Sequence, residues 1–525
     1  MDGDDEPTGD VMTPLDATLD RIGMGYYQWS LLALCGFGWL ADNMWMEGVA
    51  IALPRVQDHF NMTGQQVGVL SSFFFCGMMF GAVVWGNCSD VLGRRVAFNA
   101  TLVLSSLFGL VVSISPSFTV LAASLLLLGS AVGGSIPTDG TLFVENLPKR
   151  KHWLLTFLSV FFSLGALLTA IVAVIVIPGH SCPEAAPGSS ERPPCDVALQ
   201  NAGWRYMFGG LTLITAAMFV GRIFLFHLHE SPKYLVHTGR PEDAALVLRA
   251  ISKVNGTPLN ITVEDVRDTL TESPTTYDGE PLRTRSESQS SRGSRSLGSN
   301  DKFSRLDTLR NGLTAWYRLS SASLVPTWRR TTVLMWGYTL FNLFFPKLVE
   351  LRLGTHQEGG SVSQALWNVV IYTLGGTPGS LIGAWMVETR LGKRKSLAIS
   401  TGLTGIFCLL FSVTPSNAGV MITSVGVSLT STIMWAILYG MTPQMFVTEV
   451  RGTACGNASA LNRVAGIITP PLGGFLLDLD VSFPTYTSAL AFIVATVFAL
   501  ALPYESAADL EASEPSRGSA YSLLH

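Results

Sequence analysis

The sequence predicts an all-α membrane protein of twelve transmembrane helices, arranged as two related halves of six helices each. Composition is the first observation: of 525 residues, 48% are hydrophobic and 14% are charged, whereas about 25% are charged in ordinary soluble domains. The second is that apolar segments long enough to cross a bilayer recur along the chain. The third is that landmarks of the first half return at a constant offset in the second.

Each apolar segment is expected to be a helix. A chain in lipid must satisfy its backbone hydrogen bonds internally, as helices and closed barrels do, and these segments lack the alternating pattern of barrel strands. At about twenty residues per crossing, the spans fall near residues 28–53, 67–88, 96–114, 119–145, 153–178, 205–228, 331–352, 364–387, 396–414, 418–446, 456–477 and 484–503.

Basic residues in the short loops predict the orientation, because cytosolic loops are enriched in Lys and Arg. The loops after the second, fourth, eighth and tenth spans carry Arg94 and Arg95, 149–151, 390–395 and Arg451. The opposite loops hold fewer basic residues. We therefore expect a multi-pass membrane protein with both termini in the cytosol, in the plasma membrane or in an endomembrane such as a vesicle or vacuole.

The chain divides into five parts on this interpretation. A cytosolic tail (1–27) precedes the first half (28–228), and a cytosolic, largely disordered linker (229–328) leads to the second half (329–503) and a cytosolic tail (504–525). The linker is rich in Ser, Arg and Gly and too poor in apolar residues to fold alone, although a short amphipathic helix is expected to begin at Pro241. In the non-cytosolic loop 179–203, Cys182 and Cys195 either form a disulfide or stay reduced.

An internal duplication accounts for the two halves. Gly93 and Gly392 follow the second and eighth spans, and Glu145 and Gln444 close the fourth and tenth; both pairs are separated by 299 positions. Six-helix repeats of this kind are the architecture of many transporters, in which the substrate path runs between the halves.

Several motifs resemble those of the major facilitator superfamily. Residues 86–95, GNCSDVLGRR, are similar to its G-x-x-x-D-R-x-G-R-R loop, and residues 229–235, HESPKYL, to the P-E-S-P-R-Y-L element of sugar-porter relatives. Residues 145–148, ENLP, resemble the end of the fourth helix in those relatives. Residues 36–42, 85–87 and 463–470 look similar to the SVOP-like branch, which contains synaptic-vesicle-protein relatives and many fungal members. The resemblance covers all twelve helices and implies the major facilitator fold.

The resemblance also implies a cytosolic gate made of charged residues. Asp90 would cap a neighbouring helix and pair with an arginine across the seam between the halves, and Glu230 would lie near Arg94 or Arg451. Alternatively, Arg94 and Arg95 only determine topology. Because Val91, Thr389 and Gln444 depart from the family pattern, we expect a thinner, partly rewired network. The gating candidates are Gly86, Asp90, Gly93, Arg94, Arg95, Glu145, Glu230, Glu388, Arg390, Gly392 and Arg451.

Ionisable residues within the spans are candidates for proton coupling or substrate binding, because charges in a membrane are costly. Asp42 lies near the middle of the first span, and a carboxylate in a low-dielectric cavity can hold a proton at neutral pH. Asp139 is next, and Glu47 points about 140° away from Asp42 on a helix. The structural alternative is a hydrogen bond from Asp42 to a neighbouring helix or to Arg463.

Other candidates carry weaker signals. Lys347, at the outer end of the seventh span, is either an interfacial anchor or a ligand. The remaining residues are aromatic or polar and lie on helices that line the cavity in the resembled family: Trp45, Asn368, Tyr372, Trp435 and Tyr439.

Three functions follow. The first is a secondary active, proton-coupled transporter (a symporter) of a small polar or anionic organic solute, working by alternating access. The second is an uncoupled facilitator or exchanger, and the third is a transport-inactive membrane receptor or vesicle protein. The sequence contains no phosphate-binding glycine loop or metal-ligand cluster, so we expect no enzyme, cofactor or metal site. Besides the lipid bilayer and the solute we expect no partner, no nucleic acid, and a monomer.

Overall fold

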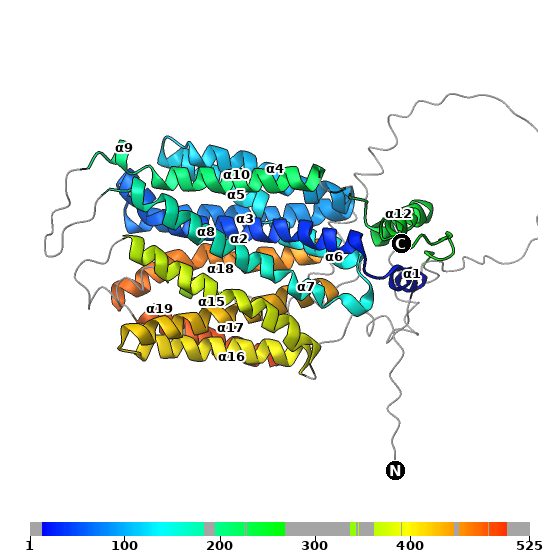
Figure 1. The fold of residues 1–525 in the computed structure, drawn as a ribbon. Helices are drawn as coiled ribbons and strands as arrows, with labels where there is room; N and C mark the ends of the chain where they lie inside the picture. The colour runs from blue at the N-terminus through cyan, green and yellow to red at the C-terminus, as the bar shows by residue number, and fades with distance from the viewer. Residues whose placement is uncertain are drawn as a thin grey trace, which may run out of the picture.

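The computed structural model describes residues 13–182, 195–224, 226, 228–267, 337–342, 345, 362–389, 391–445, 451–480 and 482–500. Within these residues the secondary structure is helical. Figure 1 shows the long helices side by side, with the first-half helices (blue to green) along one side of the bundle and the second-half helices (yellow to red) along the other.

Every predicted span of the first half corresponds to one helix or to consecutive helices. They are α2 (Tyr26–Phe60), α3 (Gly64–Leu92), α4 (Arg94–Ser113), α5 (Phe118–Val132) with α6 (Ser135–Glu145), α7 (Leu154–Phe157) with α8 (Ser159–Val176), and α10 (Gly203–Phe224). The break between α5 and α6 falls at Gly133 and Gly134. Here glycine is required, because a Cβ on Gly133 would lie 2.2 Å from the carbonyl oxygen of Met78 on α3.

The second half repeats this arrangement. Its helices are α15 (Val362–Glu388), α16 (Gly392–Val413), α17 (Asn417–Met441), α18 (Arg451–Leu479) and α19 (Phe483–Leu500). Of the predicted seventh span, residues 337–342 and 345 are described, and they are helical. The duplication is visible in the backbone: Gly93 and Gly392 have φ values of +100° and +66° and stand at the starts of the equivalent helices α4 and α16.

Eight of the described spans are long and apolar enough to cross a membrane by length and composition. The long helices α2, α15 and α18 fall outside that group. Each of them contributes polar side chains to the space between the halves.

The halves meet along α3 and α18, whose backbones approach closely. A Cβ on Gly86 would lie 2.7 Å from the carbonyl oxygen of Gly452, and one on Gly456 would lie 2.4 Å from that of Ala82. Such small-residue contacts replace the hydrophobic effect as a source of helix association in lipid.

A small folded unit lies beyond one end of the bundle, the end predicted to be cytosolic (Figure 1). It contains α1 (Pro14–Ile22), α11 (Pro232–His237), α12 (Pro241–Val254) and the segment 255–267. Its core includes Leu19, Leu248, Ile261 and Val266, none more than 1% exposed. The expectation of a largely disordered linker is therefore wrong for residues 229–267, because their apolar residues pack on α1 and on α2 rather than on each other alone.

The helix expected at Pro241 is present as α12, whereas α1, within the predicted tail, was not expected. Residues 268–328, the rest of the predicted linker, lie outside the described residues, as do 329–336 at the start of the predicted second half and 501–525.

Candidate functional site

Two adjoining hollows lie between the halves. They share residues from α2, α8, α17 and the helical residues 337–342. The shared lining is Asn43, Glu47, Phe162, Tyr338, Asn342, Trp435 and Tyr439.

An aromatic wall forms one part of this cavity. Trp435 stacks on Tyr439 with ring centroids 5.0 Å apart, and Tyr338 meets Trp435 edge to face at 5.1 Å. Phe162 of the first half meets Tyr439 edge to face at 5.8 Å. The wall therefore draws on both halves, and a solute bound here would contact both.

Hydrogen bonds fix the polar groups beside this wall. The Asn342 amide donates to the Tyr338 hydroxyl oxygen at 2.9 Å, and the Tyr372 hydroxyl donates to the Asn342 carbonyl oxygen at 2.9 Å. The indole N–H of buried Trp435 has no hydrogen-bond partner in the part of the chain that the structure describes, so it is a donor that a bound solute could use.

An ion pair connects the halves beside the cavity. Arg463 on α18 lies 3.4 Å from a carboxylate oxygen of Asp42 on α2, with side chains 2% and 0% exposed. Arg463 also lines the cavity. The second Asp42 oxygen and the Arg463 Nε have no hydrogen-bond partner among the described residues, so this buried pair is only partly satisfied.

Glu47 lies on the same helix as Asp42 but faces a different environment. It lines both hollows, and the structure gives its carboxylate no hydrogen bond or ion pair with any described residue. The two carboxylates on α2 therefore lie in different surroundings: Asp42 is paired with Arg463, and Glu47 lines the cavity.

Asp139 lies inside the first half and is absent from the cavity lining. Its carboxylate accepts from Arg222 on α10 at 2.6 Å, and both side chains are fully buried. Arg222 also donates to the carbonyl oxygens of Leu34, at 3.1 Å, and Phe98. Because these partners all belong to the first half, the pair joins helices of one half, apart from the cavity residues described above.

The structure separates the remaining candidates. Tyr372, Trp435 and Tyr439 line the cavity. Trp45 does not, because its indole N–H donates to Thr215 at 3.1 Å inside the first half. Asn368 is half-buried and is not among the lining residues, and Lys347 lies outside the described residues.

A network of buried charges closes the end of the bundle predicted to be cytosolic. Arg94 pairs with Asp90 and with Glu145, the latter at 3.2 Å. Glu145 is completely buried and also accepts from the Ser231 hydroxyl at 2.6 Å. Arg451, from the second half, lies 3.5 Å from Glu145, so a charge pair crosses the seam.

Asp90 caps the first turn of α18. Its carboxylate accepts from the Thr453 backbone N–H and hydroxyl, both at 2.6 Å, and from the Gly452 N–H at 3.2 Å. A carboxylate at a helix N-terminus satisfies free N–H groups and is favoured by the helix dipole. The cap was expected, but the arginine paired with Asp90 is Arg94 of its own half; the pair across the seam is Glu145 with Arg451.

Backbone contacts hold this gate in shape. Glu230 accepts from the Arg94 backbone N–H at 2.9 Å. Gly93 adopts a positive φ, and a Cβ there would lie 2.6 Å from a Glu230 carboxylate oxygen. Arg95 is exposed, which fits a role in topology.

The second half contains the equivalent contact without an ion pair. Lys393 and Gln444, 299 positions after Arg94 and Glu145, are joined by a hydrogen bond. The Gln444 amide also donates to the His152 carbonyl oxygen of the first half at 3.4 Å. Glu388 is exposed and Arg390 lies outside the described residues. At these equivalent positions the first half has an ion pair and the second half a hydrogen bond to a neutral amide.

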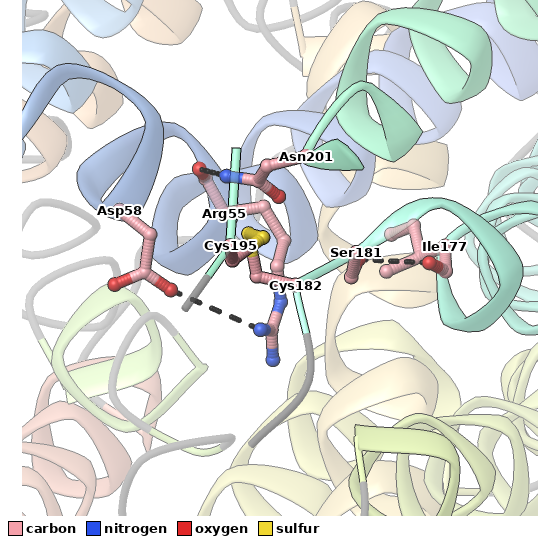
Figure 2. Close-up of a disulfide and its surroundings, with 7 residues drawn as sticks. All are labelled: Arg55, Asp58, Ile177, Ser181, Cys182, Cys195 and Asn201. Atoms are coloured by element: carbon pink, nitrogen blue, oxygen red, sulfur yellow. Dashed lines mark hydrogen bonds and ion pairs between the residues drawn. A yellow bond between two sulfur atoms is a disulfide. The ribbon is translucent and has the colours of Figure 1, made fainter. Parts of the chain in front are cut away.

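Figure 2 shows the disulfide between Cys182 and Cys195 at the opposite end of the bundle. The Asn201 amide, just beyond it, donates to the Arg55 carbonyl oxygen at 2.8 Å, which anchors the loop to the end of α2. The Ser181 hydroxyl bonds the Ile177 carbonyl oxygen at the same distance.

Sequence reasoning missed several residues of the site. Arg222 was overlooked although a buried arginine in an apolar span demands a carboxylate partner. Asn43, Tyr338, Asn342 and Phe162 gave no periodic or motif signal, because their proximity depends on how three helices cross.

Comparisons with known proteins agree with this architecture. Residues 24–288 match the family model "Sugar (and other) transporter", and residues 331–525 match "Major Facilitator Superfamily". The "MFS siderochrome iron transporter 1" of Ceriporiopsis subvermispora is 33% identical over 93% of this chain and 89% of that protein. The "Synaptic vesicle 2-related protein" of Rattus norvegicus is 25% identical over 95% of this chain and 82% of its own. Among solved structures, the proton:xylose symporter XylE bound to 6-bromo-6-deoxy-D-glucose has a TM-score of 0.69 at 15% identity, covering 93% of this chain and 99% of that one.

Proposed function

Because this chain belongs to the major facilitator superfamily of multi-pass membrane transporters, we propose that it moves a small polar organic solute by alternating access and couples that movement to protons. The solute binds in the cavity between the halves, and the charge network around Arg94 and Glu145 opens and closes one end of the path. This is a bistable contact of the kind that rigid-body movement of two halves makes and breaks.

The observation that carries the coupling proposal is the ion pair between Asp42 and Arg463. It is buried, spans the two halves and adjoins the cavity. An ionised carboxylate there depends on Arg463, because one Asp42 oxygen has no hydrogen-bond partner among the described residues. If the halves move apart and Arg463 withdraws, the buried charge becomes costly and a proton on Asp42 removes it.

The same pair supports an alternating role for Arg463. With Asp42 ionised, the guanidinium is neutralised and the halves are held together. With Asp42 protonated, Arg463 is free to turn toward the cavity that it already lines. Proton binding and solute binding are then linked through one residue, as coupling requires.

We propose the orientation with both termini in the cytosol and a monomeric transporter. The basic loops at the gate end support this orientation, and the disulfide at the opposite end suits an oxidising compartment. The plasma membrane and an endomembrane both fit.

The test uses proteoliposomes containing the full-length protein and a solute found by comparing metabolite uptake in cells with and without it. An imposed inward pH gradient should drive accumulation by the native protein. Asp42→Asn should abolish that accumulation but keep solute exchange, because exchange needs no net proton movement. Unchanged gradient-driven uptake by Asp42→Asn would refute coupling at Asp42 and leave a facilitator in which the pair is structural. A protein that moves no solute in the screen would point instead to a receptor or vesicle role.

A further inference from the structure

Glu47 places a carboxyl group in the cavity without a countercharge in the described part of the chain, and a positive charge beside it would favour its ionised form. Its carboxylate lines both hollows, and no described residue gives it an ion pair or hydrogen bond. Among the described lining residues the only cation is Arg463, whose charge is matched by Asp42. These three groups together carry one net negative charge when ionised.

Aromatic faces and edges surround this charge. Tyr338, Tyr372, Trp435 and Tyr439 line the same hollow as Glu47, and Trp435 and Tyr439 form the stacked centre of the wall. Aromatic rings attract cations through their negative faces, most strongly where water is excluded. A carboxylate among such rings is the recognition chemistry of an amine or quaternary ammonium group.

We propose that the cavity binds an organic cation, with its positive nitrogen between Glu47 and the aromatic wall formed by Tyr338, Trp435 and Tyr439. This inference rests on the proposed transport function, since it names the class of solute that the path would carry. It narrows the earlier expectation of a polar or anionic solute. While Asp42 is ionised, an anion would meet the Glu47 carboxylate and find the guanidinium of Arg463 already paired.

The binding test needs neither transport nor a gradient. Full-length protein in lipid nanodiscs is titrated calorimetrically at pH 7.5 with three probes of similar size: benzyltrimethylammonium, benzyl alcohol and benzoate. The cation should bind most tightly. Glu47→Gln should weaken its binding by about tenfold or more, the loss expected for a desolvated charge interaction, without affecting benzyl alcohol. Glu242→Gln, at an exposed carboxylate on α12, is the matched control and should bind like the native protein.

Several results would overturn the proposal: tighter binding of benzoate than of the cation, equal binding of all three probes, no binding of the cation, or unchanged cation binding by Glu47→Gln. If Glu47→Gln fails to fold, the relative affinities of the native protein for the three probes still test the proposal. Failure of proton coupling is recognised separately: benzyltrimethylammonium would then bind and exchange across proteoliposomes, but a pH gradient would not drive its accumulation.

Discussion

Arg222 on α10 donates to the carboxylate of Asp139 on α6 at 2.6 Å, and both side chains are fully buried within the first half. This pair predicts a structural role for both residues. Arg222→Met should lower the free energy of unfolding by about 3–5 kcal/mol, because removing one partner leaves an uncompensated buried charge. The midpoint of thermal unfolding in detergent measures the effect.

The control for this prediction is the double variant Asp139→Leu with Arg222→Met. It removes both charges and should recover much of the lost stability. Asp139→Asn should keep gradient-driven uptake wherever it folds, unlike Asp42→Asn. A single variant as stable as the native protein, or loss of coupling in a stable Asp139→Asn, would contradict the structural assignment.

Asp90→Ala should open the gate more often. The substitution removes the acceptor for the Gly452 N–H and for the Thr453 N–H and hydroxyl. Hydrogen bonds to charged groups contribute about 1.5–3 kcal/mol each, so the ratio of open to closed gate should rise by about tenfold or more. Spin labels at the exposed positions Val96 and Leu391 would report it as a longer distance between the halves.

Glu388→Ala is the comparison for that experiment. Glu388 lies at the equivalent end of the second half but is exposed. We therefore expect no change in the distribution of distances. A shift as large as that of Asp90→Ala would mean that both halves carry gating carboxylates, as the duplicated sequence first indicated.

The membrane spans and the two-fold repeat were predictable from the sequence because lipid imposes simple rules on length and apolarity. The landmarks at Gly93 and Gly392 identified equivalent helix starts, and the family resemblance identified the cap formed by Asp90. These features depend on residues that are close in sequence or repeat at a fixed offset.

The partners of the buried charges were less predictable. Asp139 was a candidate for proton coupling because it is ionisable and lies within a span, but the sequence did not show that its partner would be Arg222 of the same half. The pairing requires Asp139 and Arg222, which are 83 positions apart in the sequence, to lie at the same depth in the membrane on two neighbouring helices. Similarly, α1 was assigned to a tail. Its apolar face packs against α12 and the segment after it, which are more than 200 positions away, so the sequence around α1 gave no sign of this contact.

The dependence of α1 on pH is the last prediction. Asp16 on α1 accepts from Lys233 of α11 at 2.7 Å and from Lys149, in the loop after α6, at 3.1 Å. It therefore joins α1 to both of these segments. Burial alone would raise the pKa of the Asp16 carboxyl, but the two lysines outweigh burial and lower its pKa from 3.8 to about 2. Because the folded pKa lies below the unfolded one, the stabilisation is present above pH 4. It decreases as the pH falls toward 2 and is on the order of 2 kcal/mol at neutral pH.

Asp16→Asn should therefore loosen α1 at neutral pH by about that amount and make little difference near pH 2, where the native carboxyl is itself protonated. Hydrogen–deuterium exchange of residues 13–22, corrected for the intrinsic rate at each pH, would measure the docking at pH 7, 4 and 2.5. Asp243→Asn, which removes the exposed pair between Asp243 of α12 and Arg240, should give the same protection of α1 as the native protein at every pH. Equal protection of α1 in Asp16→Asn and the native protein at pH 7 would show that its apolar face alone docks it.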